Sequence, residues 1–235
     1  QGDIESLSEA DLILYNGLHL EGKMQDVFSR LRSKDLFKAS ESVPEDALIN
    51  ATEYAGAYDP HIWFDPLLWQ KVVDKLAEHL GERLPQHQSL IDVRKKDYRD
   101  TLLSTHYWIQ EQVQKIPKPQ RIIITAHDAF KYLGLRYHLE VIGLQGISTT
   151  AEYGVRDIMD LADLIVSNNI AAIFVESSVP RRSVEAVIAA AQKRGQDVKL
   201  GGELYSDALG PTGSGADSYL GMLQHNVQTI SEALR

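Results

Sequence analysis

Cysteine is absent from this chain of 235 residues. Its absence excludes disulfide bonds, thiolate metal ligands and cysteine nucleophiles. Long apolar runs are also missing, since none approaches the roughly 18 residues that a membrane-spanning helix needs. The first residues, 1–5, have neither the basic nor the apolar region of a signal peptide, so we expect any export signal to lie upstream of them.

Basic residues are in the minority, with 24 Lys and Arg against 33 Asp and Glu, for a formal net charge of -9. Surfaces that bind the phosphates of nucleic acids rely on clustered Lys and Arg, so we expect no nucleic-acid partner. The hydrophobic content of 43% is enough for a buried core. The composition therefore predicts a folded, acidic, globular protein.

Several catalytic motifs are missing as well. There is no Walker A sequence, no His-Glu-x-x-His and no Gly-x-Ser-x-Gly. The segment 210–215 is rich in glycine but lacks the lysine of a phosphate-binding loop, so we interpret it as a connection.

Short apolar segments alternate with helical patterns in the second half of the chain. Strands are expected at 121–125, 140–142, 171–175 and 198–200, and helices at 130–137, 151–167, 182–194 and 218–234. Such alternation is typical of a parallel sheet covered by helices on both faces. The strands are almost continuously apolar, as expected when both faces of a parallel sheet are buried.

The first half of the chain has a different pattern. A buried strand is expected at 12–15 and a second strand at 36–39, and Asp65 with Pro66 predicts the start of a helix that Gly81 and Pro85 end. The longest helical pattern covers 86–116. The sequence therefore predicts an α/β protein with an incomplete N-terminal lobe (1–85), a connecting helix (86–116) and a C-terminal lobe (117–235).

Two histidines and two carboxylates stand where binding chemistry is expected. His127 follows an apolar run and so lies at the carboxyl end of a predicted parallel strand, where ligands bind in open α/β sheets. A histidine that caps the next helix fits this position equally well. Glu176 ends the predicted strand 171–175, and we interpret it as a hydrogen-bond anchor for its loop.

His61 and Asp207 are weaker candidates when each is taken alone. Asp59 is well placed to orient the His61 imidazole, although a partly buried turn histidine is the commoner case. Asp207 lies in a glycine-rich loop, where an Asx turn or a helix cap is the simpler interpretation. Together, neutral imidazoles and a carboxylate suit a first-row divalent metal.

Motifs spread over nearly the whole chain carry a family resemblance. They are Ala10–Glu21, Asp59–Asp65, Thr125–Phe130, Gly143–Thr149, Phe174–Ser178 and Gly202–Ala208. In this order they resemble the metal-binding solute-binding proteins of bacterial manganese and zinc ABC importers, the TroA-like family.

The resemblance implies two α/β lobes joined by a long helix, with one metal between them. By motif, His61, His127 and Asp207 match three of the family's four ligands. The first histidine ligand of the family precedes the stretch that matches Gln1, so we expect an N-terminally truncated lobe with three ligands. The family's zinc-specific branch often has a His-rich acidic loop, which is absent here, and this favours manganese.

The function implied is capture of Mn²⁺ or Zn²⁺ outside the cytoplasm, in the periplasm or on a lipid anchor, and delivery to a membrane ABC permease. Such a protein is not an enzyme. Its metal affinity should fall as pH falls through the ordinary histidine pKa of about 6.5. An incomplete lobe also exposes sheet edge and apolar surface, so we expect self-association.

Two alternatives come from other classes of protein. A metal-dependent hydrolase would need a general base beside the metal, and Glu176 is the only candidate for that base. A cell-surface adhesin is the second alternative, and no motif in the sequence tests it.

Overall fold

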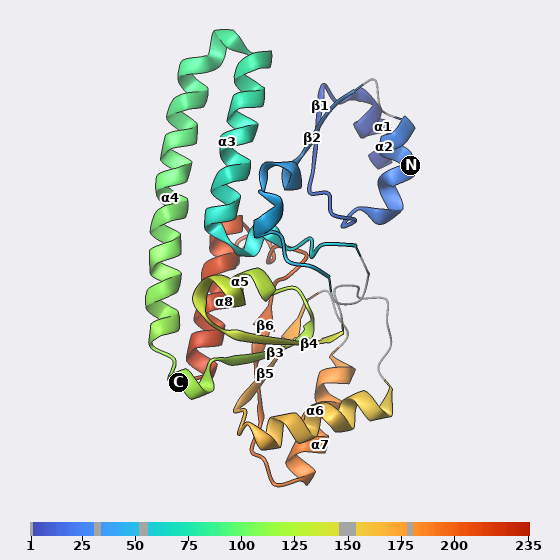
Figure 1. Ribbon diagram of the computed structural model, residues 1–235, viewed down its shortest axis with the longest axis vertical. Helices are drawn as coiled ribbons and strands as arrows, with labels where there is room; N and C mark the ends of the chain where they lie inside the picture. Colours follow the sequence, from blue (N-terminus) through green and yellow to red (C-terminus); the bar gives the residue numbers. More distant parts are fainter. Residues whose placement is uncertain (1, 31–33, 52–55, 146–153, 178–180) are drawn as a thin grey trace. The chain divides into compact units, whose positions relative to one another are not determined.

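A computed structural model describes residues 2–30, 34–51, 56–145, 154–177 and 181–235 (Figure 1). The chain divides into two compact units, Gln1–Leu102 and Leu103–Arg235. Within the described ranges, none of the helices combines the length and the apolarity that crossing a bilayer demands.

Four parallel strands form the centre of the C-terminal unit. They are β3 (Ile122–His127), β4 (Glu140–Gln145), β5 (Ala172–Glu176) and β6 (Lys199–Leu204). β3 pairs with β4 and β5 pairs with β6, both in parallel, and β3 lies beside β5. The order β4–β3–β5–β6 confirms the predicted parallel arrangement and places the carboxyl ends of β3 and β5 next to each other.

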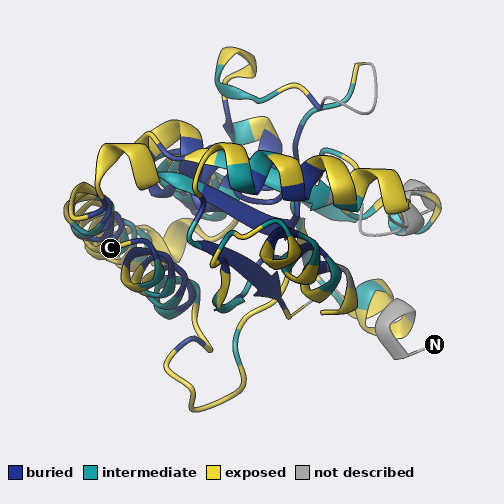
Figure 2. Cartoon of the chain, turned by 90° about the horizontal axis from the view of Figure 1, so that it is seen from below, coloured by how far each residue is buried: buried dark blue, intermediate teal, exposed yellow. Residues whose placement is uncertain are grey.

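Helices cover both faces of these strands. They are α5 (Lys131–Tyr137), α6 (Val155–Ser167), α7 (Arg182–Lys193) and α8 (Tyr219–Ala233). Figure 1 shows α6 and α7 on one side of the strands and α5 and α8 on the other. The predicted start of α6 at 151 lies outside the described residues. In Figure 2 the central strands β3 and β5 are dark blue, and the helices over them alternate between buried and exposed stripes.

The core between the strands and α6 and α7 is entirely apolar. It is built from Ile124, Ala126, Leu161, Ala162, Ile165, Ile170, Ile173, Val175, Val184, Val187, Ala191 and Val198. The central strands β3 and β5 are buried, as their apolar runs predict, whereas β4 and β6 lie outside them in the strand order and are only partly buried.

One extra residue interrupts the pairing of β5 with β6. Ile173 pairs with Leu200 but Phe174 pairs with Gly202, so Gly201 is the residue left out of the register. A Cβ atom on Gly201 would lie 2.6 Å from the ring of Phe174, and Gly202 has a φ of +136°. The bulge therefore depends on two glycines, one for space and one for backbone conformation.

The N-terminal unit contains two parallel strands, β1 (Leu12–Tyr15) and β2 (Asp35–Lys38), and the short helices α1 (Gly2–Glu9) and α2 (Gln25–Arg30). The expectation that residues 12–15 form a buried strand was wrong for Leu14, which is 53% exposed, whereas Ile13 is buried. Successive side chains of a strand point to opposite faces, and only the Ile13 face of β1 is covered by described residues.

Two long helices complete this part of the chain, α3 (Pro66–Arg83) and α4 (Gln88–Gln114). Asp65 caps α3 by accepting hydrogen bonds from the backbone of Leu67 and Leu68, with Pro66 in the first turn, as predicted. Gly81 lies inside α3 and does not end it. The predicted lobe boundaries at residues 86 and 117 stay a prediction, because the division between the two compact units falls between Leu102 and Leu103, inside α4.

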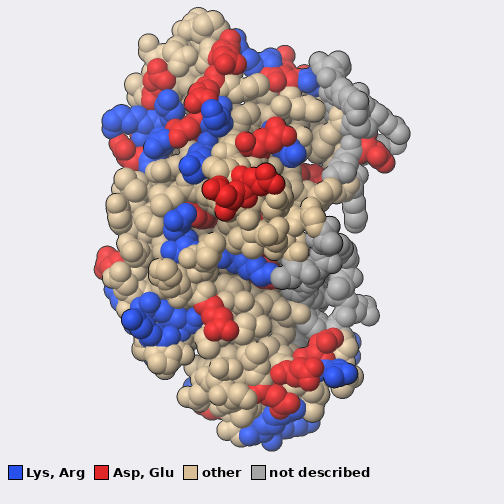
Figure 3. Space-filling model, viewed as in Figure 1, with Lys and Arg blue, Asp and Glu red and all other residues tan. Residues whose placement is uncertain are grey.

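Opposite charges are interspersed on the exposed faces of α3 and α4 (Figure 3). Lys75 pairs with Glu78, Lys96 with Asp100, and Arg99 of α4 with Asp74 of α3. The last pair joins the two helices. The remaining short elements are one-turn 3-10 helices at Gly22–Met24, Ala39–Ser42, Glu45–Ala47, Ile62–Phe64, Pro85–His87 and Lys118–Gln120.

Candidate metal centre

His127 is the last residue of β3 and is fully buried. Its backbone N–H donates to Oε1 of Glu176 over 2.8 Å, and its Nδ1 lies 2.6 Å from Oε2 of the same carboxylate. Glu176 ends the neighbouring strand β5, so the pairing follows from the order of the strands. One carboxylate thus contacts both the main chain and the imidazole ring of His127, so Glu176 anchors the end of β3, whereas the sequence led us to expect an anchor for its own loop.

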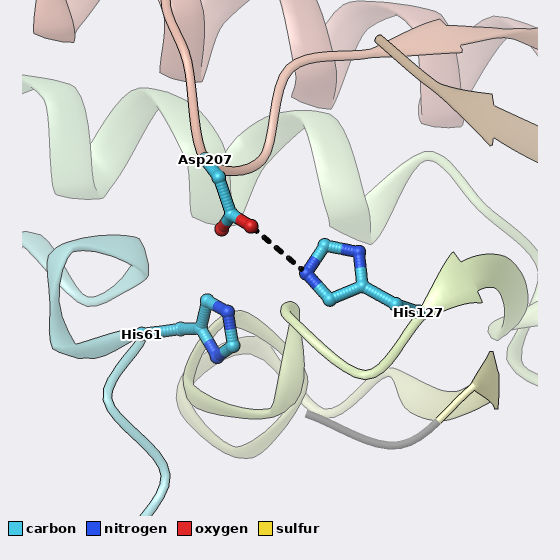
Figure 4. Close-up of side chains that lie close together, drawn as sticks. All are labelled: His61, His127 and Asp207. Carbon is cyan, nitrogen blue, oxygen red and sulfur yellow. Dashed lines mark ion pairs between the residues drawn. The ribbon is translucent and has the colours of Figure 1, made fainter. Parts of the chain in front are cut away.

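Asp207 approaches the other nitrogen of the same ring. Its Oδ2 lies 3.5 Å from Nε2 of His127, and Figure 4 shows the carboxylate pointing toward that nitrogen. The Asp207 side chain is 31% exposed, whereas that of His127 is 0% exposed. The imidazole therefore lies between a buried carboxylate on Nδ1 and a more accessible carboxylate on Nε2.

These two carboxylates control the protonation of His127. Burial of the imidazole disfavours its charged form, but hydrogen bonds to Asp207 and Glu176 and the charges of both carboxylates outweigh burial and raise the pKa of His127 to about 10. Without a metal ion the ring is therefore an imidazolium at neutral pH. A divalent cation at Nε2 would have to displace this proton.

Close backbone contact supports the segment that follows His127. A Cβ atom on Gly143 of β4 would lie 2.7 Å from Cα of Asp128, so only glycine lets β4 approach this closely. Asp128 forms an ion pair with Lys131 in the first turn of α5. These contacts keep the chain beyond β3 against β4.

His61 belongs to the N-terminal unit and is also buried. The backbone N–H of His61 donates to Oδ1 of Asp59 over 2.9 Å, and Nδ1 of His61 lies 2.7 Å from the same oxygen. Asp59 therefore orients the imidazole, as the sequence predicts. The adjoining backbone is held by Asn16, whose Nδ2 donates to the carbonyl of Pro60 over 2.9 Å.

Three other histidines contact side chains or backbone atoms of the fold. Nε2 of His79 lies 2.8 Å from Asp35, Nδ1 of His106 lies 3.0 Å from the hydroxyl of Tyr137, and Nε2 of His225 lies 3.0 Å from the carbonyl of Glu203. These contacts occupy one ring nitrogen of each of the three histidines.

The donors suit a divalent metal of the first transition row. His61 and His127 each place a carboxylate on Nδ1, which leaves Nε2 as the natural ligand atom. The Asp207 carboxylate adds an oxygen donor beside His127. Imidazole nitrogen with carboxylate oxygen is a donor set that both zinc and manganese accept.

Comparison with known proteins places the chain in a family. Residues 1–233 match the family described as zinc-uptake complex component A, periplasmic. The chain belongs to this family of metal-binding solute-binding proteins of ABC transporters. The resemblance inferred from the sequence motifs is thereby confirmed.

Individual relatives agree with this assignment. The chain is 42% identical to the manganese-binding lipoprotein MntA of Bacillus subtilis over 236 residues, which cover 100% of the chain and 77% of that protein. It is 44% identical to the zinc-binding protein TroA of Treponema pallidum, over 99% of the chain and 75% of that protein. The solved structure of TroA superimposes with a TM-score of 0.94 at 43% identity, covering 99% of this chain and 84% of that one.

The hydrolase alternative finds no support. The family is one of binding proteins, and the chain is a binding protein and not an enzyme. Glu176, the only candidate for a general base, is buried with both carboxylate oxygens directed at His127.

Proposed function

We propose that this protein captures Mn²⁺ or Zn²⁺ outside the cytoplasm, in the periplasm or on a lipid anchor, and delivers the ion to the membrane permease of an ABC importer. The observation that carries the proposal is the buried His127 imidazole with Glu176 on Nδ1 and Asp207 beside Nε2. This arrangement prepares one nitrogen for a metal and supplies a carboxylate next to it. The named relatives are metal-binding proteins of the same family.

The proposed ligands are His61, His127 and Asp207. The two histidines bind through Nε2, because Nδ1 faces Asp59 in one and Glu176 in the other. Asp207 binds through one or both carboxylate oxygens. A bidentate carboxylate raises the coordination number, which favours Mn²⁺ geometrically, while intrinsic affinity at such sites rises from Mn²⁺ to Zn²⁺.

Metal content after equilibration with equal concentrations of Mn²⁺ and Zn²⁺ tests the proposal. Mass spectrometry of the purified protein should find near-stoichiometric metal, and its identity names the preferred ion. His61→Ala, His127→Ala and Asp207→Ala should each lose the metal. His87→Ala removes an exposed histidine and should retain it.

The same experiment can contradict each part of the proposal. A wild-type protein without metal would contradict capture by this chain. Metal retained in His127→Ala would show that the ion sits elsewhere.

Self-association is a second part of the proposal. Large apolar side chains are exposed at Leu14 of β1 and at Leu90 and Val93 of α4. Contact between copies of the chain would remove this surface from water. Sedimentation velocity at micromolar concentration should show dimers or larger species, and a single monomeric boundary would contradict the idea.

A further inference from the structure

The Asp207 ligand lies beyond the end of a strand, where ladder hydrogen bonds no longer fix the backbone. β6 ends at Leu204, three residues before Asp207. The carbonyl of Leu204 still accepts a hydrogen bond from the backbone N–H of Ser177, which follows β5. The two residues between Leu204 and Asp207 must be held by something else if the carboxylate is to stay near His127.

Asn226 of α8 holds the first of these residues at two points. Its Oδ1 accepts a hydrogen bond from the backbone N–H of Tyr205 over 2.9 Å, and its Nδ2 donates to the carbonyl oxygen of Tyr205 over 2.7 Å. Asn226 is 1% exposed. The carboxamide thus hydrogen-bonds the backbone of Tyr205 as a neighbouring strand would. The backbone therefore stays fixed for one residue beyond the end of β6.

The helix that carries Asn226 is a firm support. Met222, Leu223 and Val227 of α8 are buried in the C-terminal unit. One residue earlier, His225 contributes Nε2 at 3.0 Å from the carbonyl of Glu203, on the other side of Leu204. One turn of α8 therefore contacts the backbone before and after the last residue of β6.

We propose that Asn226 is a positioning residue for metal binding, which sets the path of the Tyr205–Asp207 segment and so keeps the Asp207 carboxylate beside Nε2 of His127. This inference rests on the proposed function, because the expected effect of Asn226 is on metal affinity. A buried amide whose oxygen and nitrogen both engage the backbone of one residue has a specific structural target. That target lies two residues from the ligand.

Metal affinity and amide exchange of two variants test the proposal. Asn226→Leu keeps a side chain branched at Cγ and removes both hydrogen bonds, and Asn226→Ala removes them together with side-chain volume. Both variants should bind Mn²⁺ and Zn²⁺ about 10- to 100-fold more weakly, the range found when outer partners of a metal ligand are removed. In the metal-free protein, the amide of Tyr205 should exchange with deuterium at least about tenfold faster.

Val227→Ala is the matched control. It removes buried volume from the adjacent position of α8 and leaves the contacts of Tyr205 intact. Affinity and Tyr205 exchange in this variant should stay within about twofold of wild type. Co²⁺ bound to Asn226→Leu should also show an altered absorption spectrum, which general destabilisation of α8 would not produce.

The outcomes separate this inference from the proposed function. Unchanged exchange at Tyr205 in Asn226→Leu, or an equal loss of affinity in Val227→Ala, would overturn the positioning role. If the wild-type protein bound no metal, the proposed function would fail, while the exchange of Tyr205 in the metal-free variants would still decide whether Asn226 fixes the segment.

Discussion

Nδ1 of His127 lies 2.6 Å from Oε2 of Glu176, and both side chains are completely buried. The pair joins the carboxyl ends of β3 and β5, and it turns Nε2 of the imidazole toward Asp207.

Replacing Glu176 with Gln should weaken metal binding by about 10- to 100-fold, because the amide cannot support the imidazole as a carboxylate does. The pKa of His127 should also fall from its raised value in the metal-free protein, because one of the two charges that raise it is lost. Chelator competition measures the first effect and an NMR titration the second. Glu185→Gln, an exposed change in α7, is the control, and equal behaviour of the two variants would refute the role of Glu176.

The stability of the metal-free protein should fall as pH rises above the ordinary histidine range. The folded state raises the pKa of His127 to about 10, so it holds the proton more tightly than the unfolded chain, whose histidine pKa is about 6.5. The stabilisation is complete below about pH 6.5 and is lost by about pH 10.

Urea denaturation across this window, compared with His127→Gln, isolates the contribution of the histidine. The difference in unfolding free energy between the two proteins should shrink as pH rises. A constant difference would show that the proton on His127 does not stabilise the fold.

Metal affinity should change with pH in the opposite direction. A bound metal must displace the proton of His127, so affinity should rise up to about tenfold per pH unit between about pH 6.5 and 10. The sequence alone led us to expect this dependence only around the ordinary histidine pKa, and the two carboxylates extend it upward. Titration with a calibrated competing chelator measures the slope, and a plateau already at about pH 7.5 would argue against a raised pKa.

Asp59 should matter through the orientation of His61. Asp59→Ala removes the acceptor for both the backbone N–H and Nδ1 of His61, and metal affinity should fall about tenfold. Asp59→Asn keeps an oxygen acceptor and should lose less. Asp46→Ala, at an exposed position, provides the comparison, and the expected order of affinities is wild type, then Asp59→Asn, then Asp59→Ala.

Asp65 should contribute to stability rather than to binding. Its carboxylate accepts hydrogen bonds from the backbone N–H groups of Leu67 and Leu68 at the start of α3. Asp65→Ala should lower the free energy of unfolding by about 1 kcal/mol. Urea denaturation against Glu82→Ala, an exposed change in the same helix, measures the effect. Indistinguishable midpoints would mean that the cap does not support the helix.

The sequence predicted the strand ends well because parallel strands are continuous apolar runs. The run 122–126 identifies β3 and places His127 at its carboxyl end. The partner of His127 was harder to predict, since Glu176 follows 49 residues later and the two meet only through the order of the strands. Position alone left a helix-capping histidine as an equal alternative.

Other features depend on packing that the local pattern does not contain. Leu14 looks like a core residue within 12–15, but its side chain lies on the face opposite to that of Ile13 and is 53% exposed. Asn226 was missed because α8 was assessed by its apolar residues. The available signal was a short polar side chain between Leu223 and Val227, on a face whose other buried residues are apolar except for Ser231.

The bulge at Gly201 gives β6 one residue more than its pairing with β5 requires. Leu200 pairs with Ile173 and Gly202 with Phe174, so deleting Gly201 would leave both residues opposite their present partners and Leu204 opposite Glu176. The backbone that leads to Tyr205 and Asp207 would keep its register. The loss of the single codon for Gly201 is therefore a genetic change that the pairing of this strand can absorb, because the residue lost has no partner in β5.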